Sequence, residues 1–440
     1  MSTTHDPDRH LSPQFRRWEI TRRREAISAI LEPAGFSRDA VLRALGTDND
    51  LIDLSDIMIE SAIGYAALPL GVCRGLVVDG RTYDVPMVTE EPSVIAAATY
   101  ASGIVARSGG FVTWSDDPIT TGQIFIEEAR EDAEAAVRSA ESEIRTALVP
   151  VIANMEKRGG GYRGMDAVHL PETGLLRVQL HLDVRDAMGA NIVNTAAEAA
   201  RPVVEQVTGG RCLMAIVSNA AERRLAGASF SVPVLALSRS EHSGSDVARR
   251  IAVASDLAQE DPSRAVTHNK GVMNGITAVM LATGNDSRAV EAAVHRYAGH
   301  TGRYRGVATY RVVNDQLEGS IEVPLPVGTV GGAAGIHPTS RLALALLGNP
   351  GSSELARIAV SVGLAQNLAA VSALVTEGIQ RGHMALHARR VAWMAGARGE
   401  ERVAVARELT ELGVFNDEAA SEVLARIRAG SAGAVPEQNQ

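Results

Sequence analysis

Two histidines near the end of the chain are spaced so that they can do chemistry together. His383 and His387 stand four residues apart in GIQRGHMALHARR, a segment with the composition of a helix. On a helix this spacing places both imidazoles on one face, where they can hold a metal ion, transfer protons or only pack. A zinc site needs at least a third ligand, and no HExxH motif or nearby carboxylate at ligand spacing accompanies the pair.

Three other segments combine charged or polar side chains with helix patterns. TEEPSVIAAA places Glu90 and Glu91 before a proline at a helix start, where a capping role would explain both carboxylates. ATGNDSRAVEAAVH offers Asp286 as an N-cap. SRAVTHNKGVMNG places Lys270 and Asn274 on one helical face. Such a lysine can stabilise a developing oxyanion, although most lysines are solvated surface groups.

A fifth segment, DVRDAMGANIVNTAAEAA, has the pattern of a strand end followed by a helix. Gly189 stands where the backbone must approach something closely, and free N–H groups at a helix start can receive a phosphate or a carboxamide. The alternative is an ordinary turn with Asp186 as the helix cap. The GxGxxG fingerprint is absent, so the usual Rossmann dinucleotide site is not indicated.

Composition limits the class of protein. A chain of 440 residues with 45% hydrophobic residues is expected to form two or three globular domains. A net charge of -9 argues against binding of nucleic acid through its phosphates. Cys73 and Cys212 are the only cysteines, which fits a reducing cytoplasm. No apolar run of membrane-spanning length and no signal peptide are recognised, so we expect no membrane anchor.

Helix-rich flanks are predicted on either side of a mixed middle. Ser12-Pro13 and Ser37 are good helix starts, and a hairpin turning at Asp79-Gly80 should follow them. Residues 94–107 then form a helix of small residues. Later elements are expected at 246–260, 267–283, a hairpin over 305–324 turning at Asn314-Asp315, and helices over 353–428 with joints at Gly351 and 396–400.

The middle of the chain, from Trp114 to Ser218, indicates an inserted smaller α/β domain. Residues 122–128 and 175–184 have the character of strands. Residues 132–158 have the pattern of one long helix, which the following three glycines end.

Six motifs occur in the order that is found in one protein family. They are EEPSVIAAA, DAMGAN, HNKGVMNG, TGNDSRAVEA, VGTVGGA, and GLAQNLAA followed by EGIQRGHMALHA. On these motifs, over roughly residues 50 to 400, the chain resembles class II 3-hydroxy-3-methylglutaryl-coenzyme A (HMG-CoA) reductases, the bacterial and archaeal type. The resemblance implies two successive hydride transfers with NAD(P)H, which interconvert HMG-CoA and mevalonate plus coenzyme A without a metal.

The resemblance also implies roles for the residues that match the family motifs. The catalytic residues would be Glu91, Lys270, Asp286 and His383. The substrate-binding residues would be Ser93, Asn219, Arg264, Asn274, Gln366 and Asn367. The cofactor-binding residues would be Asp186, Met188, Gly189, Ala190 and Asn191.

These residue types suit the chemistry. A cation such as Lys270 can stabilise the oxyanion that develops in each reduction. Glu91 can supply a proton to the aldehyde oxygen, with Asp286 holding Lys270 in place. His383 can protonate the departing coenzyme A thiolate, because histidine titrates near neutral pH. His387, one turn further on, is interpreted as structural or supporting.

The implied fold is α+β, with a large helix-rich substrate and CoA domain over residues 1–113 and 219–377. A small non-Rossmann, ferredoxin-like NAD(P)-binding domain would occupy residues 114–218, and a helical flap residues 378–440. In the family the flap is mobile and the active site forms between the subunits of a homodimer. We therefore expect a cytoplasmic homodimer or higher oligomer that binds neither nucleic acid nor a membrane.

Two details concern ligand affinity. Where the family reads ENVIG this chain has Glu60-Ser61-Ala62-Ile63-Gly64, and Ser61 is shorter than Asn, so a hydrogen bond made there is lost or taken by water. Glu156 is followed by Lys157 and Arg158, and bases near the ribose would favour NADPH or dual use of NADH and NADPH.

Two alternatives belong to other classes of protein. One is a CoA-thioester-binding protein that has kept the pocket without turnover. The other is a metal hydrolase that uses His383 and His387. The sequence disfavours both, because all four catalytic residue types are present and further metal ligands are not.

Overall fold

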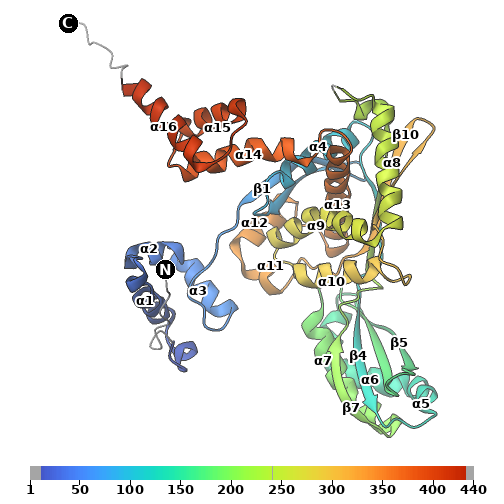
Figure 1. Cartoon of the computed structure of the whole chain (residues 1–440). Helices are drawn as coiled ribbons and strands as arrows, with labels where there is room; N and C mark the ends of the chain where they lie inside the picture. Colours follow the sequence, from blue (N-terminus) through green and yellow to red (C-terminus); the bar gives the residue numbers. More distant parts are fainter. Residues whose placement is uncertain (1–10, 240, 433–440) are drawn as a thin grey trace. The chain divides into compact units, whose positions relative to one another are not determined.

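The computed structural model describes residues 11–239 and 241–432, except for the side chains of residues 379–386 and 430–432. The chain divides into two compact units, Met1–Pro69 and Leu70–Gln440, and each is described by itself (Figure 1).

The first unit consists of three short helices around a small core. They are α1 (Ile20–Leu31), α2 (Arg38–Ala44) and α3 (Asn49–Met58), with 3₁₀ turns at Phe15–Arg17 and Glu32–Ala34. Ser37 caps α2 as predicted, because its hydroxyl accepts from the N–H of Ala40. The helix expected from Ser12-Pro13 is wrong, since that segment forms only the first 3₁₀ turn and α1 begins at Ile20.

The second unit contains a small antiparallel sheet of four strands. The strands are β4 (Ile119–Glu127), β5 (Gly161–His169), β6 (Leu176–Asp183) and β7 (Arg211–Val217), in the order β5-β6-β4-β7. The helices α5 (Ala133–Ser139), α6 (Glu141–Glu156) and α7 (Ala190–Thr208) connect them, and α6 and α7 share one hydrophobic core with the sheet. This order and connectivity are those of a ferredoxin-like βαββαβ fold (Figure 1).

Residue alternation explains which face of the small sheet is covered. Along β4, buried and half-buried side chains alternate strictly, and Ile124 and Ile126 point into the core beneath the helices. The single long helix predicted over 132–158 is wrong in one respect. It is interrupted at Ala140, whose ψ of 12° leaves the helical range and divides α5 from α6.

A second four-stranded sheet, called the large sheet here after the more extensive core that it carries, lies in the same unit. Its antiparallel strands are β3 (Val112–Ser115), β8 (Leu225–Pro233), β10 (Gln316–Pro324) and β9 (Ala308–Val313), in the order β3-β8-β10-β9. Beside it lies the hairpin of β1 (Leu70–Val78) and β2 (Arg81–Val88). Both predicted turns are confirmed. Asp79 and Gly80, and likewise Asn314 and Asp315, have the positive φ angles that tight hairpin turns require.

Long helices fill the interior between these strands. They are α4 (Val94–Ala106), α8 (Gly244–Glu260), α9 (Pro262–Ala282) and α13 (Ser352–Leu374), with α10 (Ser287–Ala298), α11 (Gly332–Ile336), α12 (Pro338–Leu346) and the 3₁₀ turn Val234–Leu237 nearby. α9 begins five residues before the predicted start, because Asp261 caps it and Pro262 occupies its first position.

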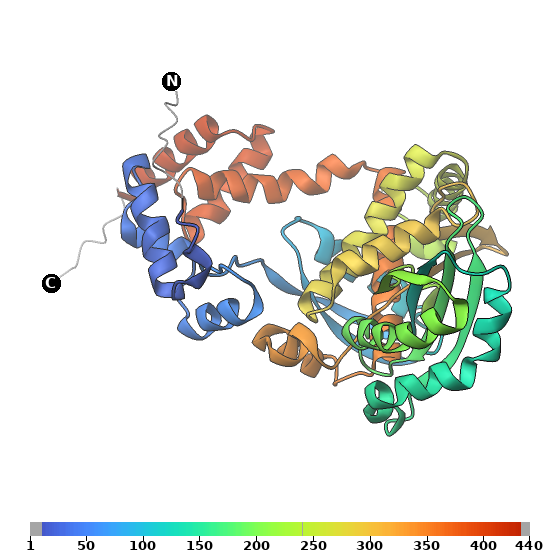
Figure 2. The same ribbon diagram turned by 90° about the horizontal axis from the view of Figure 1, so that it is seen from below.

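α13 is long and apolar enough in composition to cross a membrane, but 89% of its most apolar window is buried inside the protein. Figure 2 shows it enclosed by the surrounding helices and strands. Its composition is therefore that of a core helix.

Three helices end the described chain: α14 (Ile379–Met394), α15 (Glu400–Leu412) and α16 (Asp417–Ala432). They enclose a small hydrophobic core of their own. Gly378 before α14, and Gly396 and Gly399 between α14 and α15, have positive φ angles, so the joint predicted at 396–400 is confirmed. The predicted α+β class is confirmed as well.

Candidate active site

Glu91 and Lys270 form an ion pair between segments far apart in sequence. The Nζ of Lys270 on α9 lies 2.6 Å from Oε2 of Glu91, which stands between β2 and α4. Asn274, one turn along α9, donates from Nδ2 to Oε1 of the same carboxylate at 3.4 Å. Both Glu91 oxygens are therefore engaged by one helical face. The Lys270 side chain stays 58% exposed and the Glu91 side chain 35%, so a substrate can reach both.

The amino-acid composition also distinguishes Lys270, although no motif depends on it. The chain has 43 lysines and arginines, and only two of them, Lys157 and Lys270, are lysines. A chain that otherwise uses arginine for its cations has an ammonium group at this site. A compact point charge suits a single developing oxyanion better than a planar guanidinium does.

Ser93, the residue that begins α4, has an unusual backbone. Its φ of 72° lies in the left-handed region, and its side chain makes no capping bond to the helix. Such a conformation costs about 1–3 kcal/mol outside glycine and persists only where the surroundings enforce it. Ser93 is half-buried and lies two residues after Glu91.

Arg264 and His268 lie one turn apart near the start of α9. Partial burial lowers the pKa of the half-buried Arg264 guanidinium. Burial, with a smaller contribution from Arg264, lowers the pKa of His268 to about 4, so this imidazole is neutral at pH 7. Its Nε2 lies 3.0 Å from the carbonyl of Ala308, and its buried Nδ1 has no partner among the described residues.

Gln366 and Asn367 lie on α13 and are buried against α9. Asn367 accepts from the Tyr310 hydroxyl at 2.8 Å and donates to the carbonyl of His268 at 2.9 Å, which makes it a bridge between elements. The Oε1 of Gln366 is buried and has no partner in the described part of the chain. The two helices approach closely here, since a Cβ on Gly275 would lie 2.9 Å from the Cβ of Gln366.

Asp286 is the N-cap of α10. Its Oδ1 accepts from the backbone N–H groups of Arg288 and Ala289, both at 3.1 Å, and pairs with the Arg288 side chain at 3.3 Å. The capping interpretation is therefore confirmed, and its side-chain contacts in this structure are with its own helix. Asn219, the remaining substrate candidate, is exposed just after β7.

Four of the five cofactor candidates, Met188, Gly189, Ala190 and Asn191, line a cavity of about 550 Å³, whereas Asp186 is not among its lining residues. Ala187 to Ile192 form one wall, Gly284 to Asp286 with Arg288 a second, and Gly328 with Val330 to Ala334 a third. Gly189 is the N-cap of α7 at φ 97°, and no side chain caps that helix. The first N–H groups of α7 are therefore available to an anion.

Two glycines let segments of the protein pack closely together at this cavity. A Cβ on Gly189 would lie 2.7 Å from the Val184 side chain, and one on Gly328 would lie 2.4 Å from the backbone nitrogen of Met188. No side chain would fit at either position without a shift. A close-approach glycine, uncapped helix N–H groups and the exposed cation of Arg288 together fit a phosphate-bearing dinucleotide.

Asp186 fixes the position of this cofactor loop. The alternative that it caps α7 is wrong, because Gly189 occupies that position. Its carboxylate instead accepts from the N–H of Ser352, at the start of α13, at 2.8 Å, and its carbonyl accepts from Thr329 at 2.8 Å. Asp186 therefore ties the loop to the large-sheet part of the unit.

Arg224 was missed by motif reasoning. This 5% exposed side chain donates to the Thr120 hydroxyl and to the carbonyls of Ala187, Met188 and Val327. The only sequence signal was an arginine at the start of an otherwise apolar strand.

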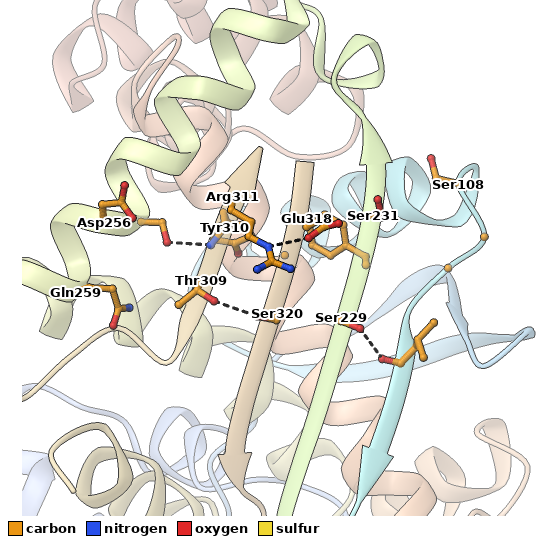
Figure 3. A pocket seen from close by; sticks show the side chains of 16 residues that line it. Ser108, Ser229, Ser231, Asp256, Gln259, Thr309, Tyr310, Arg311, Glu318 and Ser320 are labelled. Carbon is orange, nitrogen blue, oxygen red and sulfur yellow. Dashed lines mark hydrogen bonds and ion pairs between the residues drawn. The ribbon is translucent and has the colours of Figure 1, made fainter. Parts of the chain in front are cut away.

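A larger cavity of about 720 Å³ lies over the large sheet and shares no lining residue with the site (Figure 3). Its polar groups are mostly paired with one another: Thr309 with Ser320 at 3.0 Å, and Arg311 with Glu318 at 2.7 Å. It is lined by none of the candidate residues.

The histidine pair can be described only in part. His383 lies in α14, but its side chain is outside the described residues. His387 is within hydrogen-bonding distance of Arg390, and its ring lies 6.2 Å from that of Phe415. Among the described residues, no group of three or more His, Cys, Asp or Glu side chains is placed to hold a metal ion.

The chain is similar to known proteins over most of its length. The sequence profile of the hydroxymethylglutaryl-coenzyme A reductase family matches residues 19–388. The chain is 41% identical over 420 residues to the 3-hydroxy-3-methylglutaryl-coenzyme A reductase of Archaeoglobus fulgidus, covering 92% of each. Two structures of the Streptococcus pneumoniae reductase match with TM-scores of 0.73 at 38% identity. One of them is a class II enzyme described as bound to NADPH in open conformations, and its match covers 93% of this chain and 100% of that enzyme. The other match covers 95% of this chain and 100% of the second structure.

The fold and the family match thus define an oxidoreductase that acts on a CoA thioester. The chain belongs to the hydroxymethylglutaryl-coenzyme A reductase family. Its activity is the NAD(P)-dependent interconversion of HMG-CoA and mevalonate plus coenzyme A.

Proposed function

We propose that Glu91, Lys270, Asp286 and His383 carry this reaction, with the Lys270–Glu91 pair at its centre. The observation that supports the proposal most strongly is the 2.6 Å contact between the two side chains, which joins a cation and a proton carrier beside half-exposed substrate candidates. Thioester reduction to an alcohol requires two hydrides, and each nicotinamide nucleotide supplies one when bound, so two nucleotides are used in turn.

Lys270 acts on the substrate oxygen in both reductions. Negative charge develops on the thioester oxygen in the first and on the aldehyde oxygen in the second. An ammonium group held beside that oxygen lowers both barriers, and its position is set in advance by Glu91 and by the helix. Asn274 keeps the Glu91 carboxylate turned toward Lys270.

Glu91 delivers the proton that the second reduction needs. Between the two reductions the Glu91 carboxylate takes up a proton from solvent. As the aldehyde becomes an alkoxide, the resulting carboxyl group gives this proton to that oxygen, and the product is a primary alcohol. Asp286 is the second carboxylate of the proposed site, and it lies at the start of α10 on the wall of the dinucleotide cavity. Its capping bonds hold the carboxylate in one orientation while the rest of the site changes.

His383 serves the step between the reductions. The hemithioacetal breaks its carbon–sulfur bond, the carbonyl re-forms as an aldehyde, and the sulfur leaves as the coenzyme A thiolate. A histidine proton neutralises that thiolate and prevents the reverse attack. Helices α14 to α16, with their separate core and the hinge glycine Gly378, form the flap that brings His383 to the site.

The cavity beside α7 receives NADPH. Its support is the uncapped helix start, the two close-approach glycines and Arg288, as well as the NADPH named for the Streptococcus pneumoniae enzyme. Met188, Ala190 and Asn191 line the pocket, while Asp186 holds the loop from behind. Ser93, Asn219, Arg264, Gln366 and Asn367 remain our proposed contacts to the acyl group.

The protein is also proposed to act as a cytoplasmic homodimer whose active site lies at the subunit interface. Both cysteines, Cys73 and Cys212, are free thiols, which suits a reducing compartment. The dimer follows the family resemblance and is tested by measuring the mass in solution.

The decisive experiment is an assay of nicotinamide oxidation with HMG-CoA, run separately with NADPH and NADH. We expect two equivalents of NADPH to be oxidised for each mevalonate formed. Tight HMG-CoA binding without oxidation would instead indicate a CoA-thioester-binding protein. Thioester hydrolysis that a chelator abolishes would indicate a metal hydrolase.

A further inference from the structure

Arg224 is a buried cation whose hydrogen bonds all end on neutral oxygens. It stands one residue before β8 and donates to the Thr120 hydroxyl at 3.2 Å, to the carbonyl of Met188 at 2.9 Å and to that of Val327 at 2.6 Å. A longer contact of 3.4 Å reaches the carbonyl of Ala187. A buried arginine is ordinarily paired with a carboxylate, so this arrangement calls for an explanation.

The charge of Arg224 is uncompensated at the level of direct contacts. In the part of the chain that the structure describes, no salt bridge involves it. Asp183, the acid with the most influence on it, is already within 4 Å of Arg163 and Arg185. Burial lowers the pKa of Arg224 to about 10, so the group is still protonated at neutral pH. A full positive charge is therefore held directly beneath the cofactor loop.

The carbonyls that Arg224 holds belong to two walls of the dinucleotide cavity. Ala187 and Met188 lie on the wall that leads into α7, and Val327 immediately precedes Gly328 on another. In a trans peptide the C=O and N–H groups point in opposite directions. Because the Met188 carbonyl faces Arg224, the N–H of Gly189 points away from it, at the uncapped start of α7.

Only a guanidinium can make this set of contacts. Its planar fork reaches Met188 through Nη1 and Val327 through Nη2, and Nη1 also reaches Thr120. A lysine would keep the charge but could not span both walls with the same geometry. A methionine of similar length would remove both the charge and the bonds, and would leave several buried carbonyls unpaired.

We propose that Arg224 is a positioning residue for the cofactor: it holds the 187–189 loop so that N–H groups face the cavity, and it adds positive charge beneath the nucleotide phosphates. This inference rests on the proposed cofactor site. Arg224 lies outside all the sequence motifs and would determine the affinity for the dinucleotide, whereas Lys270 and Glu91 would carry out the reaction.

The test uses the full-length variants Arg224→Lys and Arg224→Met, with Val178→Ala as a control of matched instability. Val178 is fully buried in the core of the small sheet and makes none of the Arg224 contacts. Dissociation constants for NADPH and for HMG-CoA are measured by titration calorimetry, together with stability in urea. We expect the Kd for NADPH to rise about tenfold in Arg224→Lys and further in Arg224→Met, the size expected when charge-assisted hydrogen bonds are lost.

The comparison of the Kd for NADPH with the Kd for HMG-CoA decides the outcome. The proposal requires that the Kd for HMG-CoA stay within about twofold of the wild-type value. It also requires that Val178→Ala, although destabilised, bind NADPH normally. If the Kd values of both ligands rise together in step with stability, as a merely structural role predicts, or if the Kd for NADPH does not change, the proposal is overturned.

Hydrogen exchange separates this inference from the proposed function. In protein without nucleotide, amides 187–193 should exchange faster in both Arg224 variants than in the wild type and the Val178→Ala control. Unchanged exchange overturns the positioning role even if the cofactor site is right. If exchange is faster in the Arg224 variants but the wild type does not bind NADPH, Arg224 positions the loop and the cofactor assignment is wrong.

Discussion

Lys270 and Glu91, which are 179 residues apart in sequence, meet at 2.6 Å. One belongs to the middle of a long core helix and the other to the short link between a hairpin and α4. The contact has a consequence for catalysis. Before substrate arrives, the lysine charge is already balanced and oriented by a carboxylate, so little reorganisation is needed when an oxyanion forms.

Loss of the ammonium group should lower the rates of both reduction steps. We expect Lys270→Met to lower kcat about 10²–10³-fold, the usual cost of losing one preorganised donor, with HMG-CoA and with mevaldehyde alike. Substrate affinity should change less, because the proposed substrate contacts of Arg264 and Ser93 remain. A large rise in KM with a normal kcat would show instead that Lys270 only binds substrate. Steady-state kinetics with both substrates distinguish the two.

The histidine roles separate when the reaction is divided into its stages. His383→Gln should reduce turnover of HMG-CoA about 10²–10⁴-fold, as for loss of a positioned general acid, yet largely spare free mevaldehyde, which releases no thiolate. His387→Gln should affect both mildly, since the described contacts of His387 are with Arg390 and the Phe415 ring. Equal loss of both activities in His383→Gln would refute the thiolate role. A metal pair would make either change, or a chelator, abolish both activities.

Cofactor preference should follow the bases after α6. Lys157 and Arg158 are exposed there beside Glu156, and none of the three lines the 550 Å³ cavity itself. We expect NADPH to be preferred or both nucleotides to be used, and Arg158→Glu to shift kcat/KM toward NADH. A preference of the wild type for NADH above about tenfold, roughly 1.4 kcal/mol, is incompatible with this expectation.

His268 should make the protein sensitive to mild acid. Its pKa is about 4 when folded, against 6.5 as the ordinary value, so the unfolded chain binds this proton more tightly. The contribution of the neutral His268 to the free energy of unfolding is therefore fully present above about pH 6.5, and it is lost as the pH falls from about 6.5 toward 4. At pH 5 the loss attributable to this group is about 2 kcal/mol.

The matched measurement is urea unfolding of the wild type and His268→Gln at pH 7 and pH 5. Glutamine keeps a donor for the Ala308 carbonyl but cannot titrate. The variant should lose less stability between the two pH values than the wild type does. Equal losses would show that other groups cause the acid sensitivity.

Ser61 should be a site of backbone strain in the first unit. Its φ of 60° is left-handed, a conformation that asparagine tolerates better than serine and that β-branched residues tolerate poorly. Ser61→Asn, which restores the family residue, should stabilise the protein by about 0.5 kcal/mol, and Ser61→Val should destabilise it. Thermal unfolding measures this, and a parallel KM for HMG-CoA shows whether the restored amide also binds ligand.

Several features were predictable because they depend on neighbours in sequence. Asp79-Gly80 and Asn314-Asp315 supply the residues that tolerate positive φ, so their hairpins follow from local sterics. Ser37 and Asp286 cap helices through short-range hydrogen bonds. Where local signals were weak or overlooked, as at Ala140 and Asp261, the predicted helix bounds were wrong.

What the sequence by itself determined is therefore the set of reactive residue types, their motifs and the family to which these belong. The tertiary structure decided which of them meet. Nothing in periodicity or spacing places Lys270 on Glu91, turns Asp186 toward Ser352, or brings Arg224 beneath two loops. Local structure is set by dihedral sterics and hydrogen bonds within a few residues. These pairings instead depend on how distant helices and strands pack, and on many weak contacts that no short segment contains.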